Sequence, residues 1–288
     1  MHTVEAKRIL TAYRSGMNVY RGCTHGCIYC DVRSQVYGFT HPMEDVEAKA
    51  NAPALLADAL SRRRRKYVIT TGAMGDPYQP CEARLGLTRQ CLQVILRHGF
   101  GVSPHTKSTL LLRDIDLLAA INERAKCVVQ TTLTCMDDGL SRLIEPHVST
   151  TLERINMLSQ LQGRGIPTVV WLCPVLSHIT DTPRNVRAIV RACADTGVHG
   201  IVCFHMGLTL RQGDREHYYL MLDRHFPGLR ERYVQDYGDA YWCLSPRHAE
   251  LMALFHEECE AAGMLHDNDA IFRYLSHLPA QATQLELF

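Results

Sequence analysis

The sequence has almost no net charge and no long apolar stretch. Its 31 Lys and Arg residues against 30 Asp and Glu residues give a net charge of +1, which excludes a whole-molecule field that would attract nucleic acid or a membrane surface. No run of about 18 apolar residues occurs, so no membrane-spanning helix and no membrane partner are predicted. Glu5, Lys7 and Arg8 stand where a secretion signal would need apolar residues, and we expect a cytoplasmic protein.

The sequence also lacks internal repeats, low-complexity segments and a clear linker. Its 288 residues, 46% of them hydrophobic, are enough to bury one large core with or without a small appendage. Its twelve cysteines do not predict disulfides, because a chain of this size without a secretion signal keeps its thiols reduced or uses them for metals. Four of them lie in apolar stretches and are expected to be small buried side chains: Cys127, Cys173, Cys193 and Cys203.

The most informative motif is a loop with three closely spaced cysteines, Cys23, Cys27 and Cys30. Three thiolates bind three corners of a cubic iron-sulfur cluster, whereas a cluster used only for electron transfer is usually held by four cysteines. The fourth iron is then open and can bind the amino and carboxylate groups of S-adenosylmethionine. Gly22 and Gly26 allow the positive φ and the close backbone approach that wrapping a cluster requires.

A zinc site is the alternative interpretation of this loop, with His25 completing four tetrahedral ligands. Zinc sites of this kind normally have a second Cys or His pair further along the chain, and none follows Cys30 at such a spacing. The pattern therefore favours the iron-sulfur cluster, and His25 is expected to be an ordinary loop residue.

Short apolar stretches alternate with amphipathic stretches after the cysteine loop, a pattern typical of parallel βαβ units. We predict an α/β fold: a partial (β/α)6 TIM-type barrel over residues 1–205, with a mostly helical extension packed on it over residues 206–288. The cysteine loop would then follow the first strand, at the carboxyl ends where barrel active sites gather. The six predicted strands are Met17–Tyr20, Tyr67–Thr71, Gly101–Thr106, Cys127–Leu133, Thr168–Cys173 and Gly200–Phe204.

Five helices are predicted between these strands, from their apolar spacing and their capping residues. In the helix over 151–163, Leu152, Ile155 and Leu158 are expected to face the core. Gly99 is expected to end the second helix. The predicted starts are Pro53, Thr88, Asp114, Thr151 and Thr182.

The cysteine motif, with the aromatic Tyr29 just before its last cysteine, resembles the signature of the radical S-adenosylmethionine (SAM) superfamily. Further segments are similar to the branch that contains spore photoproduct lyase and the "DNA repair photolyase" proteins. The resemblance spans about residues 15–205. Its other segments are Thr70–Arg89, Thr106–Ser108, Arg113–Leu117, Glu145–Pro146 and Pro174–Asp181.

The resemblance implies a [4Fe-4S] cluster that cleaves SAM reductively to methionine and a 5′-deoxyadenosyl radical, which abstracts hydrogen from a substrate. It also implies an electron donor such as ferredoxin or flavodoxin, and we expect a monomer. Two alternatives stay open. One is a nucleic-acid repair or modification enzyme of the spore photoproduct lyase type. The other is a non-catalytic iron-sulfur or zinc-binding protein.

Five residues are candidate cofactor contacts, and the resemblance implies this role for Asp76 and Lys107. Asp76 would bind the amino group of SAM, although an Asp at this position could equally cap a turn. Lys107 would approach the carboxylate or ribose. Gln130 and Thr132 share one face of the fourth predicted strand and would bind the ribose hydroxyls or each other. Tyr29, within the cysteine motif, completes the set.

Two departures from the lyase pattern argue against thymine-dimer reversal as the leading assignment. In the lyase, a cysteine near the end of the second strand returns a hydrogen atom to the product radical, and a tyrosine follows the third cluster cysteine. The matching positions here are Ala73 and Asp31. Whether Cys81, a few residues further on, reaches the site is left open.

Two further features have alternative interpretations. Arg62–Lys66 is a dense basic run that would offset a helix dipole at its carboxyl end or bind phosphates. We favour the first, because the run lies before the second strand, away from the predicted catalytic loops. Cys203, Cys243 and Cys259 would be separate buried thiols or a partial second cluster, and their spacing matches no compact ligand motif.

Overall fold

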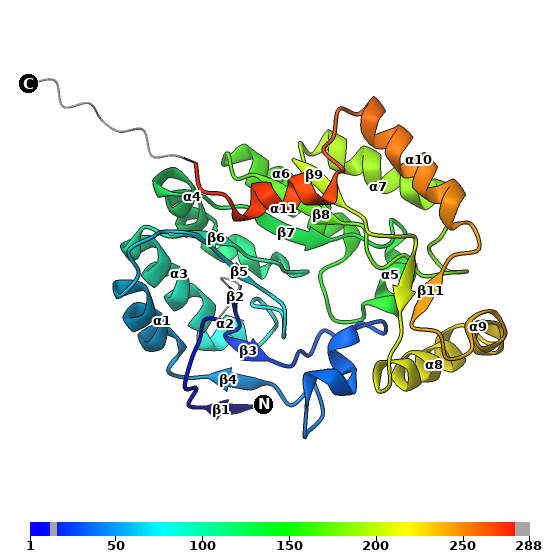
Figure 1. Cartoon of the computed structure of the whole chain (residues 1–288), viewed down its shortest axis with the longest axis horizontal. Coiled ribbons are helices and arrows are strands. Elements are labelled where there is room, and N and C mark those ends of the chain that lie inside the picture. The colour runs from blue at the N-terminus through cyan, green and yellow to red at the C-terminus, as the bar shows by residue number, and fades with distance from the viewer. Residues whose placement is uncertain (12–15, 280–288) are drawn as a thin grey trace, which may run out of the picture.

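Six short parallel strands follow one another in chain order in the computed structural model, which describes residues 1–11 and 16–279 (Figure 1). They pair as two three-stranded sheets, β2-β5-β6 and β7-β8-β9. Isolated parallel bridges from Val102 to Cys127 and from His105 to Gln130 connect β6 with β7. The α/β class with parallel strands is therefore confirmed, and barrel closure stays a prediction. The strands are β2 Gly16–Met17, β5 Val68–Thr71, β6 Gly101–Ser103, β7 Val129–Thr132, β8 Thr168–Trp171 and β9 Gly200–Val202.

The predicted first strand is wrong as a continuous element. Only Met17 pairs with β5, whereas β3 (Tyr20–Arg21) turns away and pairs antiparallel with β4 (Glu47–Lys49). β4 also pairs with β1 (His2–Val4), which completes a small sheet β1-β4-β3 that the sequence pattern did not predict. The cysteine loop leaves from β3, so this small sheet carries its first end.

Five helices connect the parallel strands, as predicted. Alternation along the strands places Val129, Val170 and Ile201 against these helices. Shorter helical segments lie in the loops. The connecting helices are α1 Ala52–Ser61, α3 Leu87–His98, α4 Ile115–Arg124, α6 Thr151–Gly163 and α7 Pro183–Asp195. The shorter segments are η1 Asp31–Arg33, η2 Gln35–Tyr37, α2 Glu82–Leu85, η3 Thr109–Asp114 and α5 Asp138–Ile144.

The helix boundaries test the predicted caps. The Thr182 hydroxyl accepts a hydrogen bond from the backbone of Asn185, which confirms that cap, and Gly99 ends α3 with a φ of 66°. Thr88 is not a cap. It lies inside α3, because the buried carboxylate of Glu82 accepts the backbone N–H groups of Thr88 and Arg89 instead.

Two further predictions for helix residues have mixed outcomes. Asp114 occupies the predicted N-cap position of α4, but its side chain makes no capping hydrogen bond and binds Arg113. On α6, Leu158 is buried as expected, whereas Leu152 is 58% exposed. The buried face of this helix also contains Arg154, Met157 and Leu161.

The described C-terminal part is mostly helical and adds an antiparallel strand pair, β10 with β11. α10 packs against α7, while α11 lies across β7–β9 on the face opposite the connecting helices (Figure 1). No helix within the described residues is long and apolar enough to cross a membrane. The elements are β10 Gly207–Thr209, α8 Asp214–His225, α9 Leu229–Tyr237, β11 Trp242–Leu244, α10 His248–Ala261 and α11 Asn268–Ser276.

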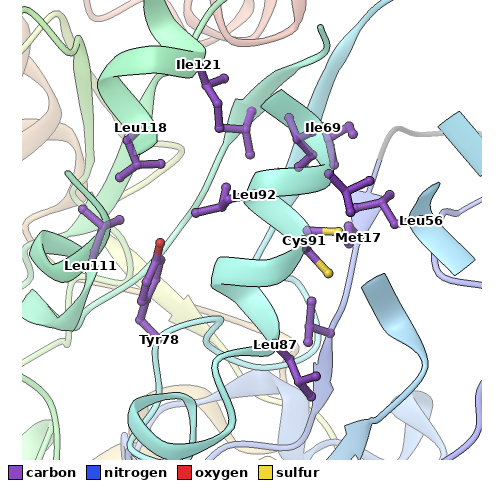
Figure 2. Packing of buried hydrophobic residues seen from close by; sticks show 14 of the residues in the cluster. Met17, Leu56, Ile69, Tyr78, Leu87, Cys91, Leu92, Leu111, Leu118 and Ile121 are labelled. Atoms are coloured by element: carbon purple, nitrogen blue, oxygen red, sulfur yellow. The ribbon is translucent and has the colours of Figure 1, made fainter. Parts of the chain in front are cut away.

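Two buried apolar clusters position the site. One lies between the first strands and helices α1, α3 and α4, with Ile69, Leu92 and Leu118 near its centre (Figure 2). The other joins Cys27–Tyr29 of the cysteine loop to residues of the C-terminal part. The cysteine loop therefore packs against side chains from the middle and the C-terminal part of the sequence.

Two leucines of α6 provide a matched test of this packing. Leu158→Ala removes a fully buried side chain and should lower the free energy of unfolding by about 2–5 kcal/mol, since the transfer and cavity costs add. Leu152→Ala should change it by only about 0.5 kcal/mol, because that side chain is largely exposed. Urea titrations of the reduced apoprotein measure both, and equal losses would contradict the assigned face of α6.

Candidate functional site

The first part of the cysteine loop is fixed by close backbone contacts. Gly22 has a φ of 89°, and a Cβ there would lie 2.4 Å from the carbonyl oxygen of Met43. Its N–H donates to Met74 O at 2.9 Å, and Cys23 N–H donates to Met43 O at 3.0 Å. A side chain at position 22 would therefore displace the segment that carries the first cysteine.

A buried glutamine, Gln79, holds the same part of the loop from the other side. Its amide nitrogen donates to Gly22 O at 3.0 Å, and its amide oxygen accepts from Thr24 N at 3.2 Å. Further along, Ile28 N–H donates to Ile144 O, and His147 N–H donates to His25 O. The loop is thus hydrogen-bonded on both flanks by segments that are distant in sequence.

The three cysteines of the loop line one cavity together. Their role as cluster ligands stays a prediction. No other cysteine of the described residues lines this cavity. Gly72 and Gly75 line the cavity without side chains. A Cβ at Gly75 would lie 2.3 Å from Gly22 O, so a side chain does not fit there. The lining residues are Cys23, His25, Cys27, Cys30, Val32, Gly72, Gly75, Asp76, His105, Thr106 and Lys107.

The environment of the thiols disfavours bare thiolates. Burial raises the pKa of Cys23 to about 12, with the Asp76 carboxylate adding to the effect. Burial likewise raises the pKa of Cys27 and of Cys30, although the Lys107 ammonium opposes it. A metal bound here must therefore take the place of the thiol protons, which is how thiolate metal sites couple binding to deprotonation.

Asp76 lines the cavity and connects three loops. It accepts hydrogen bonds from Tyr78 N–H at 2.8 Å, from the Thr106 hydroxyl at 2.6 Å and from Lys107 N–H at 2.8 Å. Its second oxygen lies 3.2 Å from Nε2 of His25. Burial acts to raise the pKa of Asp76, but His25 and these donors lower it well below its usual range. The turn-capping alternative is thus observed, and contact with a cofactor stays a prediction.

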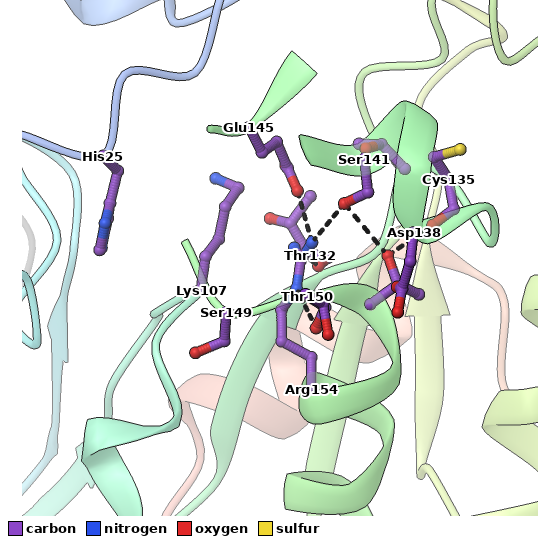
Figure 3. A network of polar contacts seen from close by, with 12 residues as sticks. His25, Lys107, Thr132, Cys135, Asp138, Ser141, Glu145, Ser149, Thr150 and Arg154 are labelled. Atoms are coloured by element: carbon purple, nitrogen blue, oxygen red, sulfur yellow. Dashed lines mark hydrogen bonds and ion pairs between the residues drawn. The ribbon is translucent and has the colours of Figure 1, made fainter. Parts of the chain in front are cut away.

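Lys107 lies beside the buried ion pair of Glu145 with Arg154 (Figure 3). Tyr29 contacts both Lys107 and Glu145. The Lys107 ammonium is 5.8 Å from the centre of the Tyr29 ring, and the Tyr29 hydroxyl donates to Glu145. The other Glu145 oxygen accepts from Arg154, and both charged side chains are fully buried. Arg154 also donates to Thr132 O at 2.7 Å, so the pair joins the cysteine loop to the end of β7.

Gln130 and Thr132 are buried but are not among the residues that line the cavity. The Gln130 amide donates to Ser103 and accepts from the Trp171 indole, both at 2.9 Å. The Thr132 hydroxyl bonds Nε2 of His105 at 3.1 Å. They therefore bond to neighbouring strands rather than to each other, and their contact with ribose stays a prediction.

Comparison with known families decides the meaning of this arrangement. The profile of the Radical SAM superfamily matches residues 17–185, more than half of the chain. The chain belongs to the radical SAM superfamily. A protein of Mycobacterium tuberculosis named "Uncharacterized protein Rv2578c" is 30% identical to this radical SAM chain over 246 residues, which cover 83% of the chain and 72% of the relative.

The solved structures similar to this radical SAM protein include spore photoproduct lyase. A structure of that enzyme with bound AdoMet and dinucleoside spore photoproduct superposes with a TM-score of 0.63 and 13% identity, covering 86% of this chain and 74% of the other. At that identity the likeness concerns the fold alone. It extends past the matched family region into the C-terminal part.

The remaining thiols of the described residues are not part of the cavity lining. Cys81 packs against the first core cluster and does not line the cavity. Cys203 and Cys259 are buried in one apolar cluster and Cys243 in another, which favours separate thiols over a second cluster. Cys127, Cys193 and Cys203 are buried as predicted, and Cys173 is only partly so.

The basic run is exposed and lies far from the loops that form the cavity. Arg62 follows the end of α1 and pairs with Asp58, and Lys66 precedes the amino end of β5. The cavity residues Gly72 to Asp76 follow the carboxyl end of the same strand. This placement agrees with a helix-terminus role for the run.

Four residues that hold the segments around the cysteine cavity were not predicted from the sequence: Gln79, His105, Glu145 as an ion-pair partner, and Arg154. Arg154 had a readable signal, since it occupies the apolar face of α6 between Thr151 and Leu158. His105 stacks on Trp171 with ring centres 5.0 Å apart, and burial lowers its pKa to about 3, so it is neutral.

The contribution of the buried Glu145–Arg154 ion pair to the free energy of unfolding can be measured. Arg154→Met leaves Glu145 buried without its partner and should lower the free energy of unfolding by about 3–5 kcal/mol. Arg154 now lowers the pKa of Glu145 against the effect of burial. Without it the pKa should rise above the unfolded value, so the loss grows as pH rises through about 4 and shrinks on acidification.

Urea titrations of the reduced apoprotein at several pH values measure this loss. The double variant Glu145→Gln with Arg154→Met is the control, since it removes both charges and should recover part of the stability and lose the pH dependence. A loss in Arg154→Met below about 1 kcal/mol would show that the pair contributes no more than an exposed one.

Proposed function

We propose that this protein is a radical SAM enzyme in which Cys23, Cys27 and Cys30 hold a [4Fe-4S] cluster. The single observation that supports this most is that the three signature thiols line one cavity, joined by no fourth cysteine of the described residues. A set of three soft thiolate donors fits an iron-sulfur cube with one iron left for a ligand. The proposal includes a partial (β/α)6 barrel over residues 1–205 and a packed extension over residues 206–288.

When bound, the cluster supplies an electron that cleaves SAM to methionine and a 5′-deoxyadenosyl radical, which takes hydrogen from a substrate. The work of the protein is to bind, orient and exclude water. Asp76 orders the two loops after β5 and β6 through its bonds to Thr106 and Lys107. Its filled acceptor positions suit a positioning role beside the amino group of SAM.

Lys107 supplies the positive charge of the site. Burial acts to lower its pKa, but the acidic groups around it, including Glu145 and Asp76, raise it above the usual value, so the ammonium stays charged. A charged ammonium that lines the cavity suits the carboxylate of SAM. We propose Tyr29, Gln130 and Thr132 as supports of this contact region, and ferredoxin or flavodoxin as the class of electron donor.

The similarity in fold to spore photoproduct lyase does not assign its substrate to this protein. A similar structure of spore photoproduct lyase has a dinucleoside spore photoproduct bound, and a nucleic-acid substrate is the second candidate here. Ala73 stands where that enzyme class carries its hydrogen-donating cysteine, and the exposed basic run lies at the opposite strand ends. A lyase of the same type is therefore not the leading proposal.

Cysteine substitution tests the proposal directly. Cys23→Ala, Cys27→Ala and Cys30→Ala should each abolish the four-iron cluster and the formation of 5′-deoxyadenosine, because each removes a ligand from the open cavity. Cys91→Ala, a buried thiol of α3, is the matched control and should retain both. The measurements are iron and sulfide content and deoxyadenosine yield after anaerobic reconstitution with a reductant.

Two outcomes would contradict the enzyme. One is a complete four-iron cluster that produces no deoxyadenosine when reduced with SAM, and the other is tetrahedral zinc in the cysteine loop. For the substrate, deuterium transferred from a labelled candidate compound into deoxyadenosine identifies the hydrogen that is abstracted. A labelled thymine dinucleotide photoproduct that transfers none would remove the lyase candidate.

A further inference from the structure

Three metal-ligating side chains from three segments meet on the small sheet that carries the cysteine loop. They are His2 on β1, His41 in the segment before β4, and Glu47 on β4. One ligand atom of each lies within 4.8 Å of the others, and they are the only such group found among the described residues. The β1–β4 register sets His2 opposite Glu47, so two of the three are placed by strand pairing.

The contacts of His41 favour a cation beside its ring. Nδ1 lies 3.0 Å from Pro42 O, and Nε2 lies 2.8 Å from a Glu47 oxygen. A neutral imidazole has one N–H and cannot donate to both acceptors. The second contact therefore requires either a protonated ring or a metal ion bound by both Nε2 and the carboxylate. A backbone carbonyl on Nδ1 with Nε2 facing a carboxylate is also how histidine ligands are held in metal sites.

The other two members are held by outer contacts of the same kind. Nδ1 of His2 lies 3.1 Å from Asp45 Oδ1, which leaves Nε2 for a further partner. Arg21 donates to Glu47 at 2.8 Å and to the carbonyl oxygens of Tyr37 and Gly38 at 2.9 Å. Arg21 thus orients the Glu47 carboxylate and fixes the backbone a few residues before His41.

We propose that His2, His41 and Glu47 bind Zn²⁺. Two imidazoles and one carboxylate are donors that zinc binds in proteins with a fourth position left for water. Since the three ligands come from β1, β4 and the segment between β3 and β4, the ion would fasten together the sheet from which the cysteine loop leaves. The site is separate from the cysteine cavity, and the proposal does not depend on the proposed reaction.

The test uses untagged full-length protein with the cysteine loop filled by anaerobic iron-sulfur reconstitution. After zinc addition and gel filtration, we expect one bound equivalent whose zinc K-edge spectrum contains imidazole and oxygen ligands and no sulfur. His2→Ala and His41→Ala should each lose this equivalent. His277→Ala, an exposed histidine outside the cluster, should retain it.

Hydrogen exchange provides a second readout that distinguishes lost binding from misfolding. Zinc should slow exchange of the backbone amides at residues 2–4 in the natural protein and not in His41→Ala. Sulfur-only ligation, no retained zinc, or an imidazole-bound equivalent that survives both His2→Ala and His41→Ala would each overturn the proposal. A failure of deoxyadenosine formation would leave these measurements unchanged, so the two proposals fail independently.

Discussion

The buried Asp76 carboxylate is the contact on which the shape of the site depends most. It accepts hydrogen bonds from its own turn and from the loop after β6, and it lies against His25 of the cysteine loop. Three segments from three strands are thereby set around one acidic group. Because a buried carboxylate oxygen without donors is costly, these contacts oppose displacement of any one segment relative to the others.

Local rules predicted much of the fold and failed where tertiary contacts replaced them. The Thr182 cap and the buried face of α7 were readable, since both depend on neighbours within one helix. The Thr88 cap was wrong because Glu82, from the preceding short helix, satisfies those N–H groups. The strand predicted over 17–20 divides because Tyr20 pairs with β4, a partner that no local pattern indicates.

The sequence predicted the side chains that line the cavity, but not the buried polar residues that hold the surrounding segments in place. The spacing of the three cysteines identified residues that line one cavity, and family resemblance added Asp76 and Lys107. The Gln79 bridge, the neutral His105 and the Glu145–Arg154 pair join segments far apart in sequence. Polar residues of this kind look like surface positions until the fold shows that they are buried.

The apolar cluster beneath the cysteine loop makes the C-terminal part a packing partner of that loop and of the residues that follow it. Ile28 and Tyr29 share that cluster with Leu208 and Tyr218, and Gln35 N–H donates to Gln212 O. The matched family region ends at residue 185, before these partners begin. The buried surface of the matched region is thus completed by side chains from beyond it. A chimera whose carboxyl half came from a distant relative would keep this packing only if the new residues fitted Ile28 and Tyr29.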